Sequence, residues 1–544
     1  MSTTAPVHEG RGLQATCVAV DIGDARILQP VSITVPVGEF VALIGPSGSG
    51  KSTMLRVLAG VAPASEGEVL IGGEEVRLRS TDIGYVPFGT LLHKELTVRE
   101  ALQCAAQLRL PPQTPRSDLS ERVEAVIAEL SMSSSADTRI GQLSDGQRRR
   151  ASCGAELVGR PDVLVLDEPA TGLDAALERR VMDMLRGLAD EGRGVLVATH
   201  ATSSLDLCDR VAVLAQGGEL RFLGRPSELL DRFEVESFDE VYNALEDDTR
   251  VRPAEEHEVS EAIAAPRSQR HREQIPPFGG QVRVLAWRYA TCMLRDRRQL
   301  LLLLGQAPII GLAIGFALPA GVFGDRTLSS YYLVMLAFLL VTGSLWLGAI
   351  TACREIVREK AIIAREVSVG VRLEAYLAAK CAVLLPLAAA EALLLSLATL
   401  LIQPIQQGPG VVFEIFLVCV VCAWAAIALG LWLSAAVTTP DQSTSSVPLL
   451  LIPQLLFAGA IIPFTSFNVV LKAVGDLMIS RWALSALGNI IGLDEQLDSS
   501  IGSVTGFDPS FYRIPAAASL GALVALSVIA LVGAALTLER RLSR

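Results

Sequence analysis

Residues 45–52 read Gly-Pro-Ser-Gly-Ser-Gly-Lys-Ser, and no other segment constrains the fold of this 544-residue chain as strongly. In the pattern G-x-x-x-x-G-K-[ST], backbone N–H groups surround phosphates, the lysine reaches the β- and γ-phosphates, and the hydroxyl ligates Mg²⁺. The mostly apolar residues 39–44 predict a buried strand before this loop, and residues 53–59 predict a helix after it. Because the N-terminus of a helix favours an anion, strand, loop and helix together predict an α/β nucleotide-binding domain.

Two acids at the end of an apolar run add to this chemistry. Residues 163–166 read Val-Leu-Val-Leu and precede Asp167 and Glu168. Residues 163–166 and 195–198 are short and apolar, which predicts buried parallel strands. A carboxylate at the end of such a strand is a typical Mg²⁺ ligand beside a phosphate-binding loop, so Ser52 and Asp167 are the predicted metal ligands. Glu168 is then placed to orient or deprotonate an attacking water.

Apolar residues concentrate in the second half of the chain. The whole chain is 51% hydrophobic, and its mean hydropathy of +0.43 is high for a soluble protein. Between residues 300 and 353 the only charges are Asp325 and Arg326, and residues 514–538 carry none. Because about 20 apolar residues span a bilayer, we predict an α/β P-loop NTPase domain followed by an all-α six-helix transmembrane domain. The six predicted spans are residues 300–322, 331–353, 376–402, 411–437, 447–463 and 514–538.

Basic residues predict how these spans are oriented. Arginines and lysines gather at residues 295–298, 354–372 and 540–544, and six spans place all three groups on one side of the membrane. Cytoplasmic loops carry such an excess of positive charge. The sequence therefore predicts a multi-pass protein of the cytoplasmic membrane with both termini in the cytoplasm. The net charge of −11 argues against a nucleic-acid partner, which usually calls for a basic face.

Composition divides the chain into four regions. Residues 1–12 are polar, and we expect a disordered N-terminus. Residues 13–246 form the predicted ATP-binding domain. Residues 247–277 carry clustered charges and end in two prolines, which indicates a charged linker. Residues 278–544 form the predicted six-span domain.

Three further motifs follow the P-loop. Residues 143–147 read Leu-Ser-Asp-Gly-Gln, residues 171–174 read Thr-Gly-Leu-Asp, and His200 comes after the second predicted strand. In their order along the chain, all these motifs together resemble the ABC transporter ATPases. The resemblance implies ATP and Mg²⁺ as cofactors, Glu168 as the catalytic glutamate and His200 as the switch histidine. It implies nucleotide contacts from Gly45, Pro46, Ser47, Gly48, Ser49, Gly50, Lys51, Ser52, Thr53, Ser144, Gly146, Gln147 and Asp174.

The chain departs from that family at three places. Asp145 stands where the signature motif has its first glycine. Phe88 follows Val86-Pro87 where the family usually has a glutamine, and a phenylalanine cannot ligate Mg²⁺ or hydrogen-bond a water. Slower hydrolysis or altered coupling to the membrane is therefore expected. No aromatic residue lies between Met1 and Glu39 to stack on adenine.

The resemblance also implies a dimer. In this family ATP lies between the P-loop of one nucleotide domain and the signature of another, and this chain has one of each. The implied partner is a second copy of the chain or a related half-transporter. A nucleotide domain ahead of six spans is similar to the G-type half-transporters and their bacterial relatives.

This similarity implies ATP-driven export of an amphipathic substrate, a lipid, glycolipid, envelope precursor or drug, by a protein in contact with membrane lipid. Two alternatives remain: an ATP-gated signalling or mechanical device without a transported substrate, and the weaker half of a heterodimer. Residues 354–360 are similar to the cytoplasmic helix that touches the nucleotide domain. Glu391, within the third predicted span, either lines a substrate path or bonds a neighbouring helix.

Overall fold

The computed structural model divides the chain into two compact units. It describes residues 12–76, 82–89, 91–172, 174–200, 202–235, 237–238, 240–241, 276–319, 322, 329–405, 408–498 and 507–542. The first unit comprises Met1–Val284 and Ile362–Arg372, and the second comprises Leu285–Ala361 and Leu373–Arg544. The expected disordered N-terminus and charged linker lie outside the described residues, apart from Gly12 and residues 276–277.

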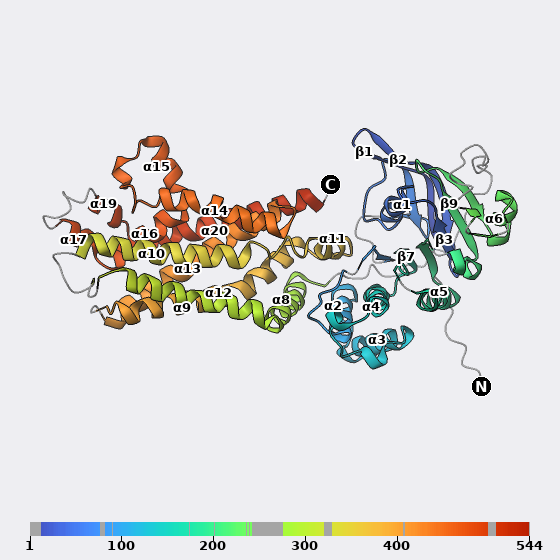
Figure 1. Ribbon diagram of the computed structural model, residues 1–544, viewed down its shortest axis with the longest axis horizontal. Helices are drawn as coiled ribbons and strands as arrows, with labels where there is room; N and C mark the ends of the chain where they lie inside the picture. The colour runs from blue at the N-terminus through green and yellow to red at the C-terminus, as the bar shows by residue number, and fades with distance from the viewer. Residues whose placement is uncertain are drawn as a thin grey trace. The chain divides into compact units, whose positions relative to one another are not determined.

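The first unit is built on two sheets (Figure 1). The antiparallel sheet has the order β2-β1-β4-β5 and consists of β1 (Leu13–Ile22), β2 (Ala25–Val35), β4 (Glu66–Ile71) and β5 (Glu74–Glu75). The second sheet has the order β10-β9-β3-β8-β7-β6 and consists of β3 (Phe40–Ile44), β6 (Ile83–Val86), β7 (Val163–Asp167), β8 (Gly194–Ala198), β9 (Arg210–Leu214) and β10 (Leu220–Gly224). All its neighbouring strands are parallel except β10, which pairs antiparallel with β9.

The central parallel strands are buried along their whole length, as their apolar sequences predict. Every residue of β3, β7 and β8 is buried. Helix α1 (Lys51–Leu58) packs in one apolar core with strands of both sheets. Because parallel strands need cover on both faces, this packing explains why the P-loop is held rigidly between a buried strand and a buried helix. The predicted α/β domain is confirmed.

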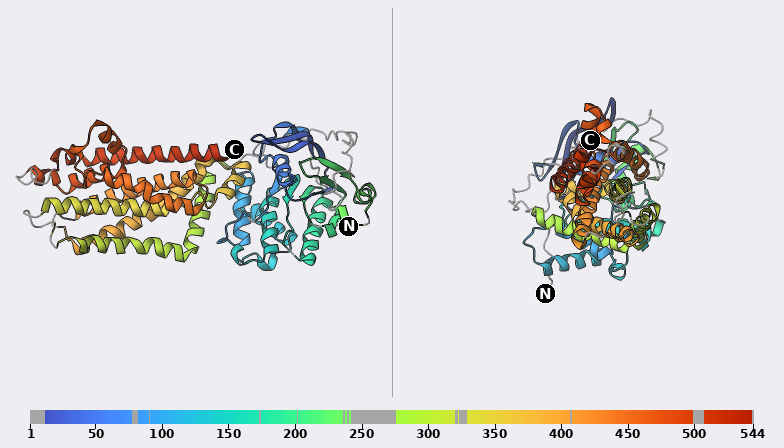
Figure 2. Two further views of the ribbon diagram at one scale, coloured as in Figure 1. Left: turned by 45° about the horizontal axis from the view of Figure 1, so that its top comes forward. Right: turned by 90° about the vertical axis from the view of Figure 1, so that its left-hand side faces the viewer.

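Helices α2 (Val98–Arg109), α3 (Arg116–Glu129) and α4 (Asp145–Leu157) form a cluster of their own beside β6 (Figure 2). Helix α2 begins with a capping box between Thr97 and Glu100, which satisfies two backbone donors. Helices α5 (Ala175–Asp190) and α6 (Pro226–Phe233) are the other described α-helices that begin between residues 12 and 235.

The second unit is a bundle of helices that lie side by side (Figures 1 and 2). The described helices after residue 275 are α8 (Phe278–Arg295), α9 (Arg297–Ala317), α10 (Ser329–Ala352), α11 (Lys360–Ser368), α12 (Leu373–Ile402), α13 (Gly408–Ala436), α14 (Pro440–Leu456), α15 (Val469–Asp476), α16 (Ile479–Ile490), α17 (Leu493–Asp498), α19 (Pro509–Tyr512) and α20 (Ala516–Leu542). Five of them, α9, α10, α12, α13 and α20, are long and apolar enough to cross a membrane. They match five of the six predicted spans.

The remaining predicted span, residues 447–463, was wrong in its bounds. Helix α14 begins at Pro440 and ends at Leu456, so it contains 17 residues. At about 1.5 Å per residue it is shorter than a hydrocarbon core of about 30 Å. The apolar residues that follow it do not continue the helix, since Pro463 precedes a short turn of 3₁₀-helix at Phe464–Ser466.

Small residues bring the long helices close together. A Cβ added at Gly348 of α10 would lie 2.3 Å from the carbonyl oxygen of Ala423 in α13. A Cβ at Gly311 of α9 would lie 2.5 Å from the carbonyl oxygen of Leu395 in α12. Such close backbone approach is typical of helices that associate in lipid, where packing replaces the hydrophobic effect.

Candidate functional site

The P-loop begins directly after β3 with Gly45, at a position where only glycine fits. Gly45 has φ +154°, and a Cβ there would lie 2.1 Å from the carbonyl oxygen of Leu214. At the other end of the loop, Gly50 caps α1 with φ +95°. The loop therefore turns between Gly45 and Gly50. It presents backbone N–H groups at the start of α1, which is the arrangement that binds phosphate.

Lys51 lies over this loop. Its Nζ donates to the carbonyl oxygens of Gly45 at 2.7 Å and Pro46 at 2.9 Å, and its side chain is buried. Burial lowers the pKa of Lys51, while the charges of Glu168 and Asp167 act in the opposite direction. The charges of Asp167, which ends β7, and of Glu168, which follows it, therefore act on the ammonium group.

Asp167 ends β7 at the carboxyl edge of the parallel sheet, and its chemistry fits a divalent cation. The carboxyl is 3% exposed, and its Oδ1 has no hydrogen-bond partner. Burial raises its pKa, whereas a hydrogen bond with Ser52 lowers it. A buried carboxylate oxygen without a donor, next to a hydroxyl, offers the hard oxygen ligands that Mg²⁺ prefers. Ser52 and Asp167 remain the predicted metal ligands.

Glu168 adopts an unusual backbone conformation. Its φ is +51°, in the left-handed region that few residues other than glycine adopt. Its N–H donates to the carbonyl oxygen of Ala198 at 2.9 Å, and its Oε2 accepts from the Thr171 hydroxyl at 2.8 Å. Strained residues persist where surrounding contacts hold them, and they concentrate at functional sites.

His200 contacts the same carboxylate. Its Nε2 lies 3.1 Å from Glu168 Oε1, and its side chain is 40% exposed. The histidine follows β8, and the N–H of the preceding Thr199 donates to the carbonyl oxygen of Leu43 at 3.1 Å. The structure therefore brings the predicted catalytic pair together and fixes it to β3, the strand that leads into the P-loop.

The signature residues lie at the start of α4. Ser144 caps this helix: its hydroxyl accepts from the Gln147 N–H at 3.3 Å, and the Gln147 side chain accepts from the Ser144 N–H at 3.0 Å. A hydrogen bond to Arg148 holds the pKa of Asp145 below its usual range. Gly146 is buried within the first turn. The sequence predicts that Ser144, Gly146 and Gln147 contact the nucleotide, and that role stays a prediction.

Asp174 also serves as a helix cap. Its Oδ1 accepts from the Leu177 N–H at 2.9 Å at the start of α5. A capping carboxylate stabilises a helix N-terminus by about 1 kcal/mol. This local role accounts for an aspartate at that position, and its predicted nucleotide contact also stays a prediction.

Sequence reasoning missed one residue at the site, Arg149 of α4. Its Nη1 donates to the carbonyl oxygen of Glu168 at 3.0 Å, and its Nη2 donates to that of Thr171 at 3.2 Å. Its guanidinium also lies 5.6 Å from the ring centroid of Phe88, which is 59% exposed. The only sequence signal was the run of three arginines directly after the signature.

The segment that groups with the nucleotide unit differs from the predicted one. Residues 354–360 belong to the second unit, where Arg354 donates to Thr444 and Arg358 donates to Gln299. The segment Ile362–Arg372 groups with the first unit instead. The expected contact of residues 354–360 with the nucleotide domain stays a prediction.

Residues 362–372 are anchored by a buried cluster of charges. Glu156 of α4 lies between two arginines, accepting from Arg109 Nη2 at 2.8 Å and from Arg365 Nε at 3.3 Å. Gln281, which is fully buried, donates to the carbonyl oxygen of Gly370 and accepts from the N–H of Arg372 at 2.8 Å. These contacts satisfy both charged and backbone groups, as buried polar groups require.

Inside the membrane-type bundle, Glu391 bonds a neighbouring helix. Its Oε1 accepts from the Thr351 hydroxyl of α10 at 3.0 Å, and its side chain is fully buried. Of the two predicted roles for Glu391, this contact favours the helix-bonding one. Near the start of α12, Lys380 pairs with Glu355 at 3.3 Å and with Glu359 at 2.9 Å.

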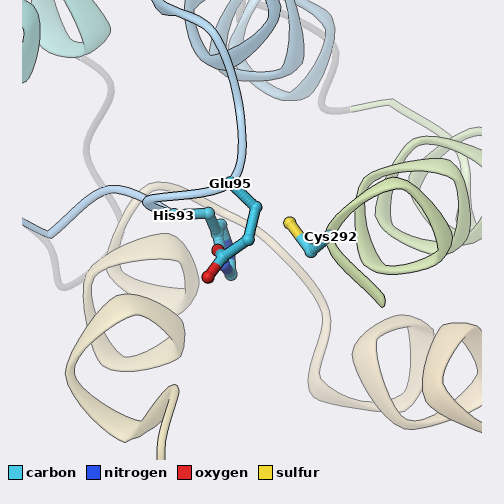
Figure 3. Close-up of side chains that lie close together, drawn as sticks. All are labelled: His93, Glu95 and Cys292. Atoms are coloured by element: carbon cyan, nitrogen blue, oxygen red, sulfur yellow. The ribbon is translucent and has the colours of Figure 1, made fainter. Parts of the chain in front are cut away.

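His93 and Glu95, whose side chains are both of a kind that can ligate metals, lie on the loop before α2. Ligand atoms of His93 and Glu95 lie within 4.8 Å of each other (Figure 3). Cys292, the third side chain in Figure 3, comes from α8 and belongs to the second unit. Zinc sites use three or four protein ligands, so His93 and Glu95 alone do not make a metal centre.

Two family models match the chain. Residues 28–171 match the model described as ABC transporter, and residues 280–491 match the model described as ABC-2 type transporter. The first match lies in the first unit, and most of the second match lies in the second unit. The first match ends at Thr171, and so it includes the P-loop, the signature, Asp167 and Glu168.

Three relatives match the whole chain or part of it. An ABC transporter ATP-binding/permease protein of Mycobacterium tuberculosis is 34% identical over 536 residues, covering 93% of this chain and 60% of the relative. The Nod factor export ATP-binding protein I of Sinorhizobium fredii is 35% identical over 224 residues, covering 40% of this chain and 64% of the relative. ABC transporter G family member 11 of Arabidopsis thaliana is 37% identical, covering 41% of this chain and 34% of the relative. The chain thus spans less than two thirds of the length of each of these three proteins.

Proposed function

The chain belongs to the ABC transporters, with an ATPase domain ahead of an ABC-2 type permease domain, and we propose that it is a half-transporter that exports an amphipathic substrate. The observation that carries this proposal is the cluster of Lys51, Glu168 and His200 around the P-loop. The apolar surface of five membrane-length helices supports a substrate that partitions into lipid. The lipid, glycolipid, envelope-precursor and drug classes all meet that condition.

In this proposal, each residue of the site has a distinct task. The P-loop N–H groups and Lys51 bind the β- and γ-phosphates of ATP. Ser52 and Asp167 would hold Mg²⁺, which would supply positive charge against the charge that develops on the phosphates. Glu168 accepts a proton from the attacking water, and His200 orients the Glu168 carboxylate through their 3.1 Å contact.

The proposed working unit is a dimer. Ser144, Gly146 and Gln147 lie at the start of α4, and the side chains of Ser144 and Gln147 hydrogen-bond to this segment and to Ser135, outside the P-loop. We propose that they complete the ATP site of a second copy or of a related half-transporter. Closure of the two ATPase domains then moves residues 362–372, which are part of the ATPase unit although they lie between two membrane helices in sequence.

We further propose that the protein lies in the cytoplasmic membrane with both termini in the cytoplasm, where ATP is available. The arginines in the first turn of α9 and those in the last turn of α20 support this orientation.

ATP hydrolysis by the purified protein in lipid vesicles tests the proposal. Glu168→Gln should abolish hydrolysis and keep ATP binding, while Glu68→Gln, on an exposed strand position, should behave as wild type. A fluorescent lipid analogue in the same vesicles should move across the bilayer only with ATP. Hydrolysis without movement of any substrate class would favour the signalling or mechanical device. Activity only after addition of a related half-transporter would favour the heterodimer.

A further inference from the structure

Arg149 contacts the backbone on both sides of the turn that carries Glu168. Its two terminal nitrogens donate to the carbonyl oxygens of Glu168 and Thr171, at 3.0 and 3.2 Å. The Thr171 hydroxyl in turn donates to the Glu168 carboxylate at 2.8 Å. One guanidinium therefore holds the backbone of the glutamate and the backbone of the residue that orients its side chain.

This contact matters because the Glu168 backbone is in the left-handed region. A non-glycine residue at φ +51° is less stable than in its ordinary conformations. Its N–H is held by Ala198 in β8, and its carbonyl oxygen is held by Arg149 in α4. Without the second contact, the carbonyl is free to rotate, and the carboxylate moves with it relative to His200.

Phe88 lies next to the Arg149 guanidinium. It follows β6, and the Arg149 guanidinium lies 5.6 Å from its ring centroid. A guanidinium over an aromatic ring is attracted by the ring's electrons. The phenylalanine that replaces the family's glutamine thus cannot ligate Mg²⁺, yet it contacts a residue that reaches the catalytic glutamate.

We propose that Arg149 is a positioning residue for Glu168 and that Phe88 holds the Arg149 guanidinium in place. The inference rests on the proposed role of Glu168 in hydrolysis. It gives a function to Phe88, which otherwise only replaces a glutamine that could ligate Mg²⁺. Through Arg149, the loop after β6 is linked to the backbone of Glu168 by a route that does not need a glutamine.

The first test compares arginine variants by steady-state ATP hydrolysis in vesicles. Arg149→Ala should lower kcat by about 10- to 100-fold, the range for a catalytic group misplaced by about 1 Å. The KM for ATP should stay within about twofold, because the lost contact acts on the transition state and not on nucleotide binding. Arg149→Lys, which cannot donate to both carbonyls in the same way, should fall between wild type and Arg149→Ala.

Arg150→Ala is the matched control. Arg150 is the next residue of α4 and also donates to two backbone carbonyls, those of Leu130 and Ser131, at 3.0 and 3.4 Å. It should cost folding stability without the selective loss of kcat. Equal losses of kcat in both variants would overturn the inference, because any arginine–carbonyl contact on α4 would then suffice.

The second test uses Phe88 and remains decisive if Arg149→Ala fails to fold. Phe88→Ala should lower kcat about two- to fivefold, the size of an exposed cation–π contact, and Phe88→Tyr should retain activity. The effects of Phe88→Ala and Arg149→Lys should be non-additive in a double-mutant cycle. A kcat above wild type in Phe88→Gln would overturn the inference, since a metal-ligating or water-binding glutamine would then be what the chain lacks.

Failure of the proposed function itself gives a different result. If Glu168→Gln hydrolyses ATP like wild type, Glu168 is not the catalytic glutamate and the inference falls with it. If Glu168→Gln is inactive while Arg149→Ala keeps the wild-type kcat, the inference alone is wrong.

Discussion

Arg365 and Glu156 form a buried ion pair although 209 residues separate them in the chain. Glu156 lies on α4, the helix that begins with the signature, and Arg365 lies on α11, between two membrane-length helices in sequence. Their side chains are 7% and 8% exposed. Burial alone would raise the pKa of Glu156, but the charges of Arg109 and Arg365 outweigh it and hold the pKa below its usual range.

Removing the shared carboxylate should be worse than removing one arginine. Glu156→Ala leaves Arg109 and Arg365 buried and facing each other, which should cost about 3–5 kcal/mol. Arg365→Ala leaves Glu156 paired with Arg109 and should cost about 1.5–3 kcal/mol. Thermal unfolding of the purified protein in detergent measures the order of the two variants. Arg26→Ala, which breaks an exposed pair with Asp21, should change little and serves as control. A larger loss for Arg365→Ala would contradict the arrangement.

The same carboxylate should make stability depend on pH. Because the pKa of Glu156 is lower in the folded than in the unfolded protein, its contribution is fully present above about pH 4.5. It is lost as the pH falls through the lower, folded pKa. The wild type should therefore lose more stability than Glu156→Gln between pH 6 and pH 3.5, as measured by denaturation at each pH. Parallel curves for the two proteins would show that the pKa of Glu156 is the same in the folded and the unfolded protein.

His200→Ala should lower kcat for ATP hydrolysis by about 100-fold, within the range for acid–base catalysis. The reason is that Glu168 loses its 3.1 Å contact with Nε2. Binding of a fluorescent ATP analogue should be unchanged, because no P-loop group is altered. His93→Ala, on the loop before α2, should hydrolyse ATP like wild type. An unchanged kcat in His200→Ala would remove the histidine from the mechanism.

Packing of α10 on α13 should be sensitive to a single methyl group. Gly348→Ala places a Cβ 2.3 Å from a backbone oxygen, so the two helices must separate. Overpacking of this kind costs about 1–3 kcal/mol. Gly305→Ala on α9 meets no atom within 4 Å and should be neutral or slightly stabilising. Unfolding temperatures in detergent compare the two, and equal values would mean that the helices are not in close contact at Gly348.

The parts of this molecule that sequence predicts well are those encoded locally. The P-loop, the strand ending in Asp167 and Glu168, and five of the membrane-length helices each show in a short stretch of residues. The bounds of α14 were missed because apolar residues after Leu456 satisfy the same hydropathy pattern without continuing the helix. The φ of Glu168 left no trace in composition.

Contacts between distant residues could not be predicted in the same way. Nothing in the sequence pairs Glu156 with Arg365, since either could have been one of many solvated surface charges. Arg149 is one of three consecutive arginines, and only the folded chain shows which of them reaches Glu168. Tertiary contacts decide these roles, and they depend on how helix α4 is placed against β7.

The assignment of Ile362–Arg372 to the first unit means that this ATPase is not a contiguous stretch of sequence. A fragment cut after residue 284 would lack Arg365, one of the two arginines that pair with Glu156 on α4. Chimeras that exchange the ATPase with a relative would need to carry this eleven-residue insert along with the N-terminal half. The same condition applies in evolution: the ATPase and the permease can be recombined with other proteins only if residues 362–372 change together with the ATPase.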